Sequence, residues 1–217
     1  MNLEKQLPDI TKSTVIACTA SVVLLTIVLL FTRQFFYLYL IWNLFLAWVP
    51  LYIACFLEFT KAKWKVLTLI AAWLVFFPNA PYIITDLVHL GQNHKVPFWA
   101  DALLLFSFGW SGLILGIISL LKVHAAINRY LTPVLSWVVM SGFIALSGFG
   151  IYLGRVERYN SWDIIANPFG LLKDVVTIIT HPADYPTSII ITMAFFLFLL
   201  TAYTSVYLLF TKQKVHA

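Results

Sequence analysis

The sequence carries little charge. Only 11% of its 217 residues are Asp, Glu, Lys or Arg, compared with about a quarter in soluble proteins. Hydrophobic residues make up 61% of the chain. A water-soluble fold has too little interior to bury that much apolar surface. The shortage of charge therefore excludes an ordinary soluble domain and predicts an integral membrane protein in contact with the lipid bilayer.

The sequence is also poor in cysteine. Its two cysteines, Cys18 and Cys55, each lie within an apolar run. Two isolated thiols exclude a disulfide framework and a thiolate metal site. A glycine loop of the kind that cradles nucleotide phosphates is absent as well. The sequence therefore identifies no cofactor, and whether the protein uses one stays unknown.

Histidine and acidic side chains offer one further way to hold a metal ion. They lack the tight His-x-x-x-His spacing of many zinc sites, so we predict no metal site. The candidates are Asp86, His89, His94 and His181. The basic residues are spread along the chain rather than gathered on one soluble face, which excludes a nucleic-acid partner.

Six runs are long and apolar enough to cross a hydrocarbon core about 30 Å thick, which takes about 20 residues. We expect a single all-α domain over residues 1–217, a polytopic bundle of six transmembrane helices. The predicted spans are 13–31, 35–57, 66–85, 98–121, 133–153 and 187–210, with a long outer loop over 154–186.

Basic residues are divided unevenly between the two ends of the predicted bundle. The N-terminus, the loops 58–65 and 122–132 and the C-terminal tail carry nine Lys and Arg and three Asp and Glu. The opposite connections carry five basic and six acidic residues. Because cytoplasmic loops are enriched in Lys and Arg, we expect both termini in the cytoplasm and the acidic end outside.

The third span is interrupted by the sequence Phe-Pro-Asn-Ala-Pro-Tyr at 77–82. Each proline removes a backbone donor and disfavours helical geometry in the residue before it, so carbonyls are freed at membrane depth. Such a break needs polar partners from protein or water. Asn43 on the second span lies at a comparable depth, and we expect it to be a partner of Asn79.

Beyond the break, three polar side chains share one helical face. Tyr82, Asp86 and His89 are spaced i, i+4 and i+7. A carboxylate beside an imidazole is a natural acid–base pair, because the carboxylate favours the charged imidazole and fixes its tautomer. We predict Asp86 and His89 as catalytic residues. The alternative is that both side chains are simply solvated at the membrane interface.

The outer loop opens with two arginines, Arg155 and Arg158, on the side where topology disfavours positive charge. Arginine binds anions and carboxylates through its planar fork of donors. The loop therefore holds an anionic ligand, internal ion pairs with neighbouring carboxylates, or both, since the two interpretations are compatible. The predicted substrate-binding residues are Asn79, Tyr82, Arg155, Arg158, Asn160, Trp162 and Asp163.

The same loop contains a short amphipathic helix. Asn167 is placed as its N-cap and Pro168 as its first residue, and His181-Pro182 ends it. Its apolar residues form one stripe, the pattern of a helix that lies in the membrane interface. We expect it to cover the outer end of the bundle. The stripe consists of Phe169, Leu172, Val176 and Ile179.

The fourth span carries a stripe of small residues with Gly-x-x-x-Gly spacing, which permits another helix to approach closely. We expect it to pack against a similar stripe on the fifth span. The first stripe is Gly109, Gly112 and Gly116, and the second is Ser147, Gly150 and Gly154.

Two segments resemble the signature segments of a known family. The segment 77–90 and the sequence Arg-Tyr-Asn-Ser-Trp-Asp at 158–163, with the following Asn167-Pro168, are similar to the uncharacterised bacterial integral membrane protein family catalogued as domain of unknown function 1361. The resemblance implies a multi-spanning fold in a bacterial plasma membrane. It brings no established activity, so no catalytic residue is carried over.

Three functions stay open. The first is an outward-facing polar site that binds or processes an anionic or lipid-linked substrate, with Asp86 and His89 as the acid–base pair. The second is a small-solute transporter or its membrane subunit, since broken helices line many transport sites, although no inverted repeat is detected. The third is a structural or accessory membrane protein without catalytic activity. The sequence indicates no protein partner.

Overall fold

The structure, a computed structural model, describes residues 3–33, 35–93 and 95–212, and side chains within residues 12–209. Helices account for all the regular secondary structure in these ranges. In chain order the elements are α1 (Leu3–Thr32), η1 (Phe35–Leu38), α2 (Tyr39–Phe59), α3 (Lys63–Phe76), α4 (Asn79–Tyr82), η2 (Ile83–His89), α5 (Phe98–Ile127), α6 (Pro133–Arg155), α7 (Asp163–Ala166), α8 (Pro168–Thr180) and α9 (Pro186–Lys212).

Within the described residues, six stretches of helix are long and apolar enough to cross a membrane. This confirms the predicted fold class, a polytopic bundle of membrane-spanning helices, and the chain is a multi-pass membrane protein. The third stretch combines α3, α4 and η2, so the predicted break in this span is confirmed. The six stretches are Lys12–Thr32, Phe35–Phe59, Lys63–His89, Phe98–Ile127, Pro133–Arg155 and Pro186–Leu209.

Helix α5 is the centre of the bundle and runs six residues beyond the predicted end at 121. It packs against α1, α2, α4, η2, α6 and α9. About two thirds of its apolar stretch is buried inside the protein, whereas only about a tenth of the apolar stretch of α9 is buried. The last turns of α5 contain polar residues, so the sequence predicts a loop there. Lys122 and His124 are buried in the structure, and both have partners: Lys122 pairs with Glu58 of α2, and His124 hydrogen-bonds to Tyr203 of α9.

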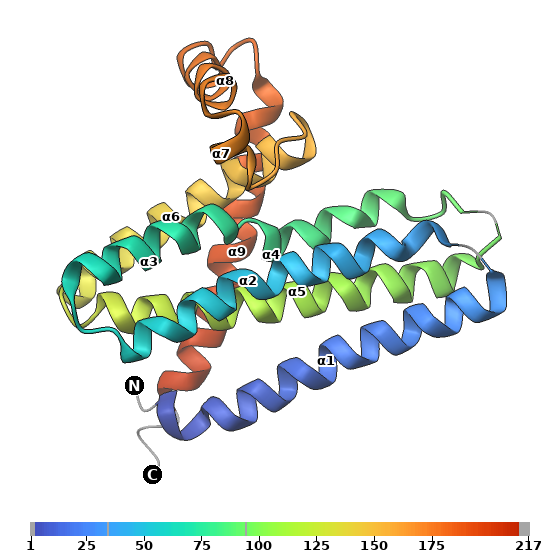
Figure 1. The fold of residues 1–217 in the computed structure, drawn as a ribbon, viewed down its shortest axis with the longest axis horizontal. Coiled ribbons are helices and arrows are strands. Elements are labelled where there is room, and N and C mark those ends of the chain that lie inside the picture. The colour runs from blue at the N-terminus through green and yellow to red at the C-terminus, as the bar shows by residue number, and fades with distance from the viewer. Residues whose placement is uncertain (1–2, 34, 94, 213–217) are drawn as a thin grey trace.

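Figure 1 shows two groups of helices that lie at an angle to each other: α1, α2 and α5 form one group, and α6 and α9 form the other. Helices α1, α2 and α5 run along the long axis, while α9 crosses them steeply and packs against α6. The connections α2–α3 and α5–α6 lie at the same end as the start of α1 and the end of α9. This alternation matches the predicted arrangement of the loops, and the cytoplasmic location of that end stays a prediction.

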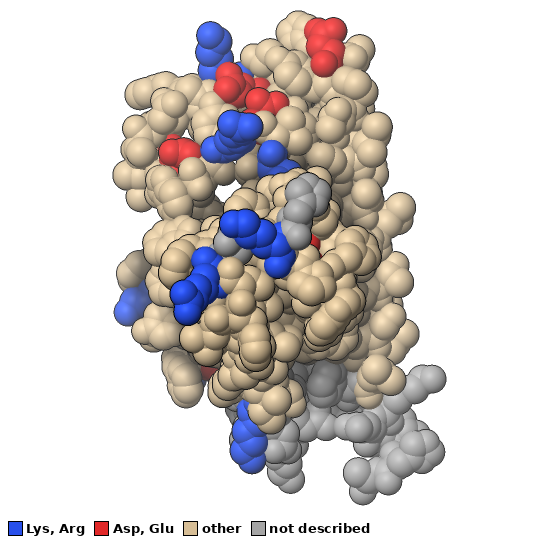
Figure 2. Space-filling model, turned by 90° about the vertical axis from the view of Figure 1, so that its right-hand side faces the viewer, with Lys and Arg blue, Asp and Glu red and all other residues tan. Residues whose placement is uncertain are grey.

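The opposite end carries charges of both signs. Figure 2 turns this end toward the viewer and shows Asp and Glu side chains gathered in its upper part, with Lys and Arg side chains on the upper and the central parts. The upper part belongs to the segment between α6 and α9, which contains four acidic residues. They are Glu157, Asp163, Asp174 and Asp184.

The two small-residue stripes do not pack on each other, so that prediction is wrong. Both instead contact the broken third span. A Cβ atom on Gly112 would lie 2.4 Å from the carbonyl oxygen of Ala80, and one on Gly150 would lie 2.6 Å from Pro78 Cγ. Helix α4 is therefore held between α5 and α6 at distances that only glycine permits.

Helix α8 begins as predicted, with the Asn167 side chain accepting a hydrogen bond from the backbone N–H of Gly170 and Pro168 in the first turn. Its predicted apolar stripe faces away from the protein, and Phe169 is 85% exposed. Ile178, outside that stripe, is the buried residue of the helix. Figure 1 places α8 over the ends of α6 and α9 only, so it covers one part of the outer end.

Candidate functional site

The break in the third span is stabilised by side chains that bond to its freed carbonyls. Helix α3 ends at Phe76, and the Asn79 amide donates from Nδ2 to the Phe76 carbonyl at 2.9 Å. Ser161, in the loop after α6, donates from its hydroxyl to the Val75 carbonyl at 3.2 Å and accepts from Asn79 Nδ2 at 2.8 Å. The loop therefore covers the break and provides hydrogen bonds to backbone groups that lipid could not satisfy.

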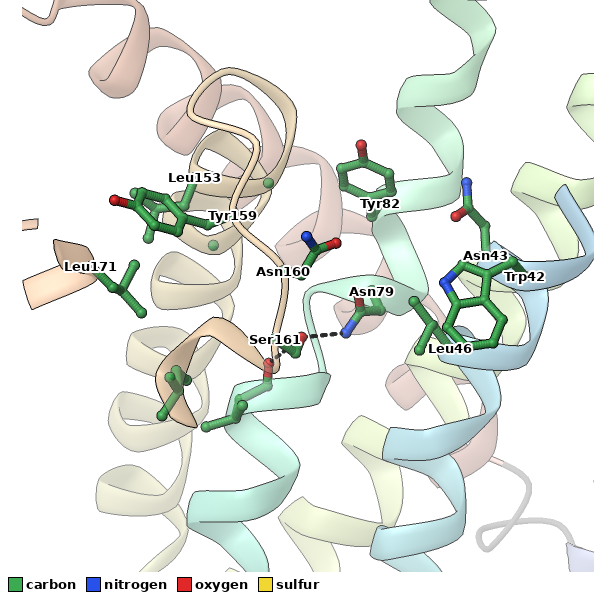
Figure 3. A pocket seen from close by; sticks show the side chains of 14 residues that line it. Trp42, Asn43, Leu46, Asn79, Tyr82, Leu153, Tyr159, Asn160, Ser161 and Leu171 are labelled. Carbon is green, nitrogen blue, oxygen red and sulfur yellow. Dashed lines mark hydrogen bonds between the residues drawn. The ribbon is translucent and has the colours of Figure 1, made fainter. Parts of the chain in front are cut away.

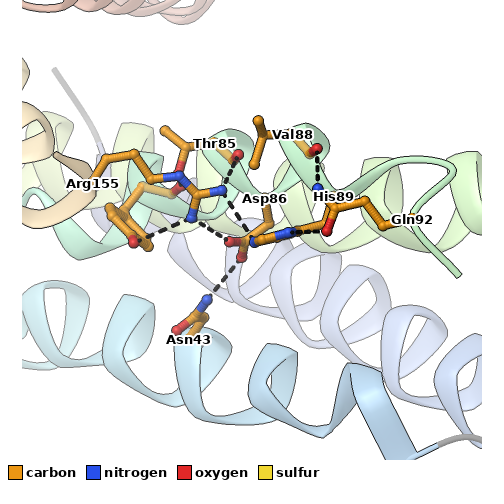
Figure 4. Close-up of polar contacts among 8 residues, drawn as sticks. Asn43, Thr85, Asp86, Val88, His89, Gln92 and Arg155 are labelled. Atoms are coloured by element: carbon orange, nitrogen blue, oxygen red, sulfur yellow. Dashed lines mark hydrogen bonds and ion pairs between the residues drawn. The ribbon is translucent and has the colours of Figure 1, made fainter. Parts of the chain in front are cut away.

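An ion pair between a buried carboxylate and a partly exposed arginine lies one turn beyond the break. Asp86 is only 1% exposed, and Arg155 from the end of α6 donates from Nη1 to Asp86 Oδ1 at 3.3 Å. Asn43 of α2 donates to the other oxygen, Oδ2, at 2.8 Å (Figure 4). The expected contact between Asn43 and Asn79 is therefore wrong, because Asp86 and Ser161 are their partners. A buried carboxylate is a stronger acceptor than an amide.

Arg155 also lies between Asp86 and His89. Its Nη2 donates to the Thr85 carbonyl at 3.0 Å and contacts His89 Nε2 at 3.2 Å (Figure 4). A guanidinium only donates, so Nε2 is the acceptor and the ring proton is on Nδ1, which contacts Gln92 Oε1 at 3.0 Å. Arg155 thus bridges the predicted acid–base pair.

A cavity of about 180 Å³ opens beside this network (Figure 3). Its walls come from α2, α4, the end of α6 and the loop that follows α6. Most of its polar wall consists of uncharged side chains with hydrogen-bonding capacity. These are Asn43, Asn79, Tyr82, Tyr159, Asn160 and Ser161, and the apolar wall includes Trp42, Leu46, Leu153, Ile164 and Leu171.

The loop that closes the cavity is fastened by carboxylates of the two helices that follow it, α7 (Asp163–Ala166) and α8. The Asn160 N–H donates to Asp163 Oδ2 at 2.6 Å, and the Tyr159 hydroxyl donates to Asp174 Oδ2 of α8 at 2.6 Å. The bond to Asp174 raises the pKa of Tyr159 to about 12, since ionised tyrosine cannot donate. Arg158, just before Tyr159 and Asn160, has a φ of +62°, in the left-handed region.

The structure divides the predicted site residues into three groups. Asn79, Tyr82 and Asn160 line the cavity. Asp86, His89 and Arg155 form the adjacent network, which meets the cavity at Tyr82, whose hydroxyl accepts from Arg155 Nη1 at 3.4 Å. The remaining three lie outside the cavity wall and are Arg158, Trp162 and Asp163.

Trp162 reaches the cavity indirectly, through edge-to-face contact with Trp42, whose ring centroid is 6.4 Å away. Trp42 and Leu46 on α2, and Ser161 and Tyr159 in the loop, are wall residues that the sequence reading missed. Ser161 and Tyr159 flank Asn160 in the sequence, and Trp42 precedes Asn43. Their position next to these polar residues is the sequence feature that could indicate a place in the cavity wall.

Catalytic roles for Asp86 and His89 stay predictions. Both carboxylate oxygens of Asp86 and both ring nitrogens of His89 have protein partners. Groups already bonded to protein partners hold a structure in place more readily than they exchange protons with a ligand. Among the described residues, no group of three or more His, Cys, Asp or Glu could hold a metal ion.

Comparison with known proteins identifies one family. Its model is described as "Protein of unknown function (DUF1361)" and matches residues 42–202, which include every residue of the cavity wall and of the Asp86 network. No curated protein and no solved structure matches the chain. Because the match covers most of the chain, this membrane protein belongs to the DUF1361 family, whose function is unknown.

Proposed function

We propose that the protein binds the polar group of a lipid-linked ligand in the cavity between α2, α4 and the 156–162 loop. The observation that carries this proposal is a cavity with an uncharged, hydrogen-bonding wall built around a helix break in a membrane span. Irregular backbone at such a position is typical of segments that line a binding cavity. On the predicted topology, the cavity faces the outer side of the membrane.

The rim of the cavity supports a ligand that carries an apolar tail. Trp42 and Ile164 belong to the wall and are 53% and 44% exposed on the surface of the bundle. Ile165, next along α7, is 86% exposed. A polar group in the cavity would therefore have apolar side chains beside it, against which an acyl or prenyl chain can pack.

Holding a ligand has more support than proton transfer. The Asp86 network ties α2 to η2 and α6, and because η2 continues directly from α4, it fixes three walls of the site relative to one another. Fixed walls give a binding site its geometry before the ligand arrives. Asp86 and Arg155 act as positioning residues in this proposal, and Asn79, Tyr82 and Asn160 contact the ligand.

A transport function has less support because the space beneath the break is filled. Phe77, Ala80 and Ile83 are fully buried, and Gly112 of α5 approaches the Ala80 carbonyl closely. A solute path toward the other end would need this contact to separate. Packed cores resist such opening unless a second arrangement exists.

Native mass spectrometry of the purified chain tests the proposal. We expect the wild-type protein to retain one equivalent of a lipid-linked species after detergent exchange. Asn160→Ala removes a wall amide whose side chain makes no hydrogen bond within the described chain, so it leaves the network intact. We expect retention to fall about fivefold, the effect of one lost hydrogen bond.

The matched control is Asn128→Ala, an exposed asparagine just beyond α5 at the opposite end of the molecule. This variant should retain the ligand as the wild type does. Equal retention by Asn160→Ala and the wild type, or no retained species in any preparation, would contradict the proposal.

A further inference from the structure

The hydrogen bonds of the cavity wall determine which ligand groups it can accept. The Asn43 amide donates from Nδ2 to a carboxylate, and the Asn79 amide donates from Nδ2 to the Phe76 carbonyl. Carboxylate and carbonyl oxygens only accept, so these contacts fix which side of each amide is nitrogen. The second Nδ2 proton of Asn79 goes to Ser161.

The amide oxygens are thereby left for a ligand. Within the described part of the chain, no donor reaches Oδ1 of Asn43 or Oδ1 of Asn79. Figure 3 shows the Asn43 oxygen turned toward the space between α2 and the loop. The Tyr82 hydroxyl accepts from Arg155 and keeps its proton to donate. The side-chain amide of Asn160, unbonded within the described residues, adds a further acceptor and further donors, so the wall offers acceptors and donors side by side.

Several charged groups around the cavity are engaged with protein, while Arg158 is exposed and lies outside the wall. Arg155 is paired with Asp86, while Asp163 accepts from the loop backbone and Asp174 accepts from Tyr159. Glu157 accepts from the Tyr152 hydroxyl at 2.6 Å. The wall itself contains no charged side chain among the residues that the structure describes. A ligand ion would therefore enter without a counter-charge, which is costly at membrane depth.

These contacts favour one chemical class. A phosphate or carboxylate only accepts hydrogen bonds, so it could use the Tyr82 and Asn160 donors but would leave the amide oxygens of Asn43 and Asn79 without a donor. An ammonium group only donates, leaves the Tyr82 proton unused and lacks a carboxylate. A hydroxyl both donates and accepts, and so matches the wall in both directions. Trp42 and Tyr159 add aromatic surface, which packs well against the C–H faces of a sugar ring.

We infer that the ligand's polar group is uncharged and rich in hydroxyls, as in the sugar head of a neutral glycolipid. The inference rests on the proposed function and specifies its ligand. It differs from the anionic ligand expected from the sequence because Arg155, which contacts the wall residue Tyr82, is already paired with Asp86.

A competition experiment separates these chemistries. The full chain is stripped of lipid in a detergent with a polyoxyethylene head and is then mixed with equal amounts of three lipids with the same acyl chains: monogalactosyl diacylglycerol, phosphatidic acid and phosphatidylcholine. Native mass spectrometry measures the fraction carrying each lipid. We expect the galactolipid adduct to exceed each of the others about tenfold, the effect of one to two hydrogen bonds.

Variants and a free sugar complete the test. Asn160→Ala and Trp42→Ala should each lower the galactolipid adduct about fivefold, and Asn128→Ala should not. A preference for phosphatidic acid, or equal binding of all three lipids, overturns the inference. In the first case the proposed function survives if Asn160→Ala lowers that adduct.

Free galactose distinguishes the source of the hydroxyl group. If it does not displace the galactolipid at millimolar concentration, the lipid-linked ligand is supported. If it displaces the lipid completely, the hydroxyl-rich class stands and the lipid-linked part of the proposed function fails. If no lipid binds and free galactose does not bind either, both proposals are contradicted.

Discussion

Asn79 Nδ2 lies 2.8 Å from Ser161 Oγ, and this contact joins the break in the third span to a loop 82 positions further along the chain. The same serine bonds to the Val75 carbonyl, which the break leaves without its helical partner. One hydroxyl therefore stabilises the broken helix and holds the loop that forms a wall of the cavity.

Replacement of this serine should loosen the loop. In Ser161→Ala, the Val75 carbonyl loses its partner and the loop loses a contact with α4, at a cost of about 1–2 kcal/mol. We expect faster hydrogen–deuterium exchange of the backbone amides in residues 156–162. Ser205→Ala, which removes only a local bond to the Thr201 carbonyl in α9, is the control and should leave this exchange unchanged.

The two arginines of the outer loop should differ in their effect on stability. Arg155→Met removes four hydrogen-bond partners and leaves the Asp86 carboxylate buried without its counter-charge. We expect a loss of about 3 kcal/mol in the free energy of unfolding, measured by denaturant titration in detergent micelles. Arg158→Met, at an exposed position outside the network, should change it by no more than about 0.5 kcal/mol.

Addition of Asp86→Asn to Arg155→Met removes the unpaired charge. The double variant should therefore be more stable than Arg155→Met alone. A double variant whose loss equals the sum of the two single losses would indicate that the two residues act independently.

The close contact of α4 with α5 should be sensitive to a single methyl group. In Gly112→Ala the new Cβ atom lies 2.4 Å from a backbone carbonyl, so the helices must separate, and we expect a loss of about 1–3 kcal/mol. Gly142→Ala is the matched control, because nothing lies within 4 Å of the added atom. Its thermal stability should equal or slightly exceed that of the wild type. Equal melting temperatures for both variants would contradict the close packing.

Cysteine labelling tests the predicted orientation. In a background with Cys18 and Cys55 replaced by alanine, Lys95→Cys lies between η2 and α5 and Asn128→Cys lies at the opposite end. A membrane-impermeant maleimide should label Lys95→Cys in intact cells, whereas Asn128→Cys should react only after lysis. The reverse pattern would place the cavity on the cytoplasmic side.

Sequence patterns that depend on local chemistry predicted much of this architecture. Span length follows from runs of apolar residues, and the break at 77–82 follows from the two prolines it contains. The cap at Asn167 follows from side-chain hydrogen bonding within one turn. Each of these features is determined by residues that are near neighbours in the chain.

The pairing of polar groups could not be predicted in the same way, because it depends on how the helices are rotated against one another. Asn43 was within reach of Asn79 by depth alone, but the structure turns it toward Asp86. The glycines of α5 and α6 were matched to each other, whereas α4 lies between them. Arg155 was grouped with Arg158 by sequence proximity, yet only Arg155 enters the network.

An experimental structure of the full chain in nanodiscs of native membrane lipid, with an antibody fragment bound to a loop away from the cavity, tests the central claim most directly. The account predicts density for one polar group in the cavity, within hydrogen-bonding distance of the Asn43 and Asn79 side-chain oxygens and continuous with a chain beside Trp42. A cavity that holds only water while lipid is resolved elsewhere on the surface would contradict it.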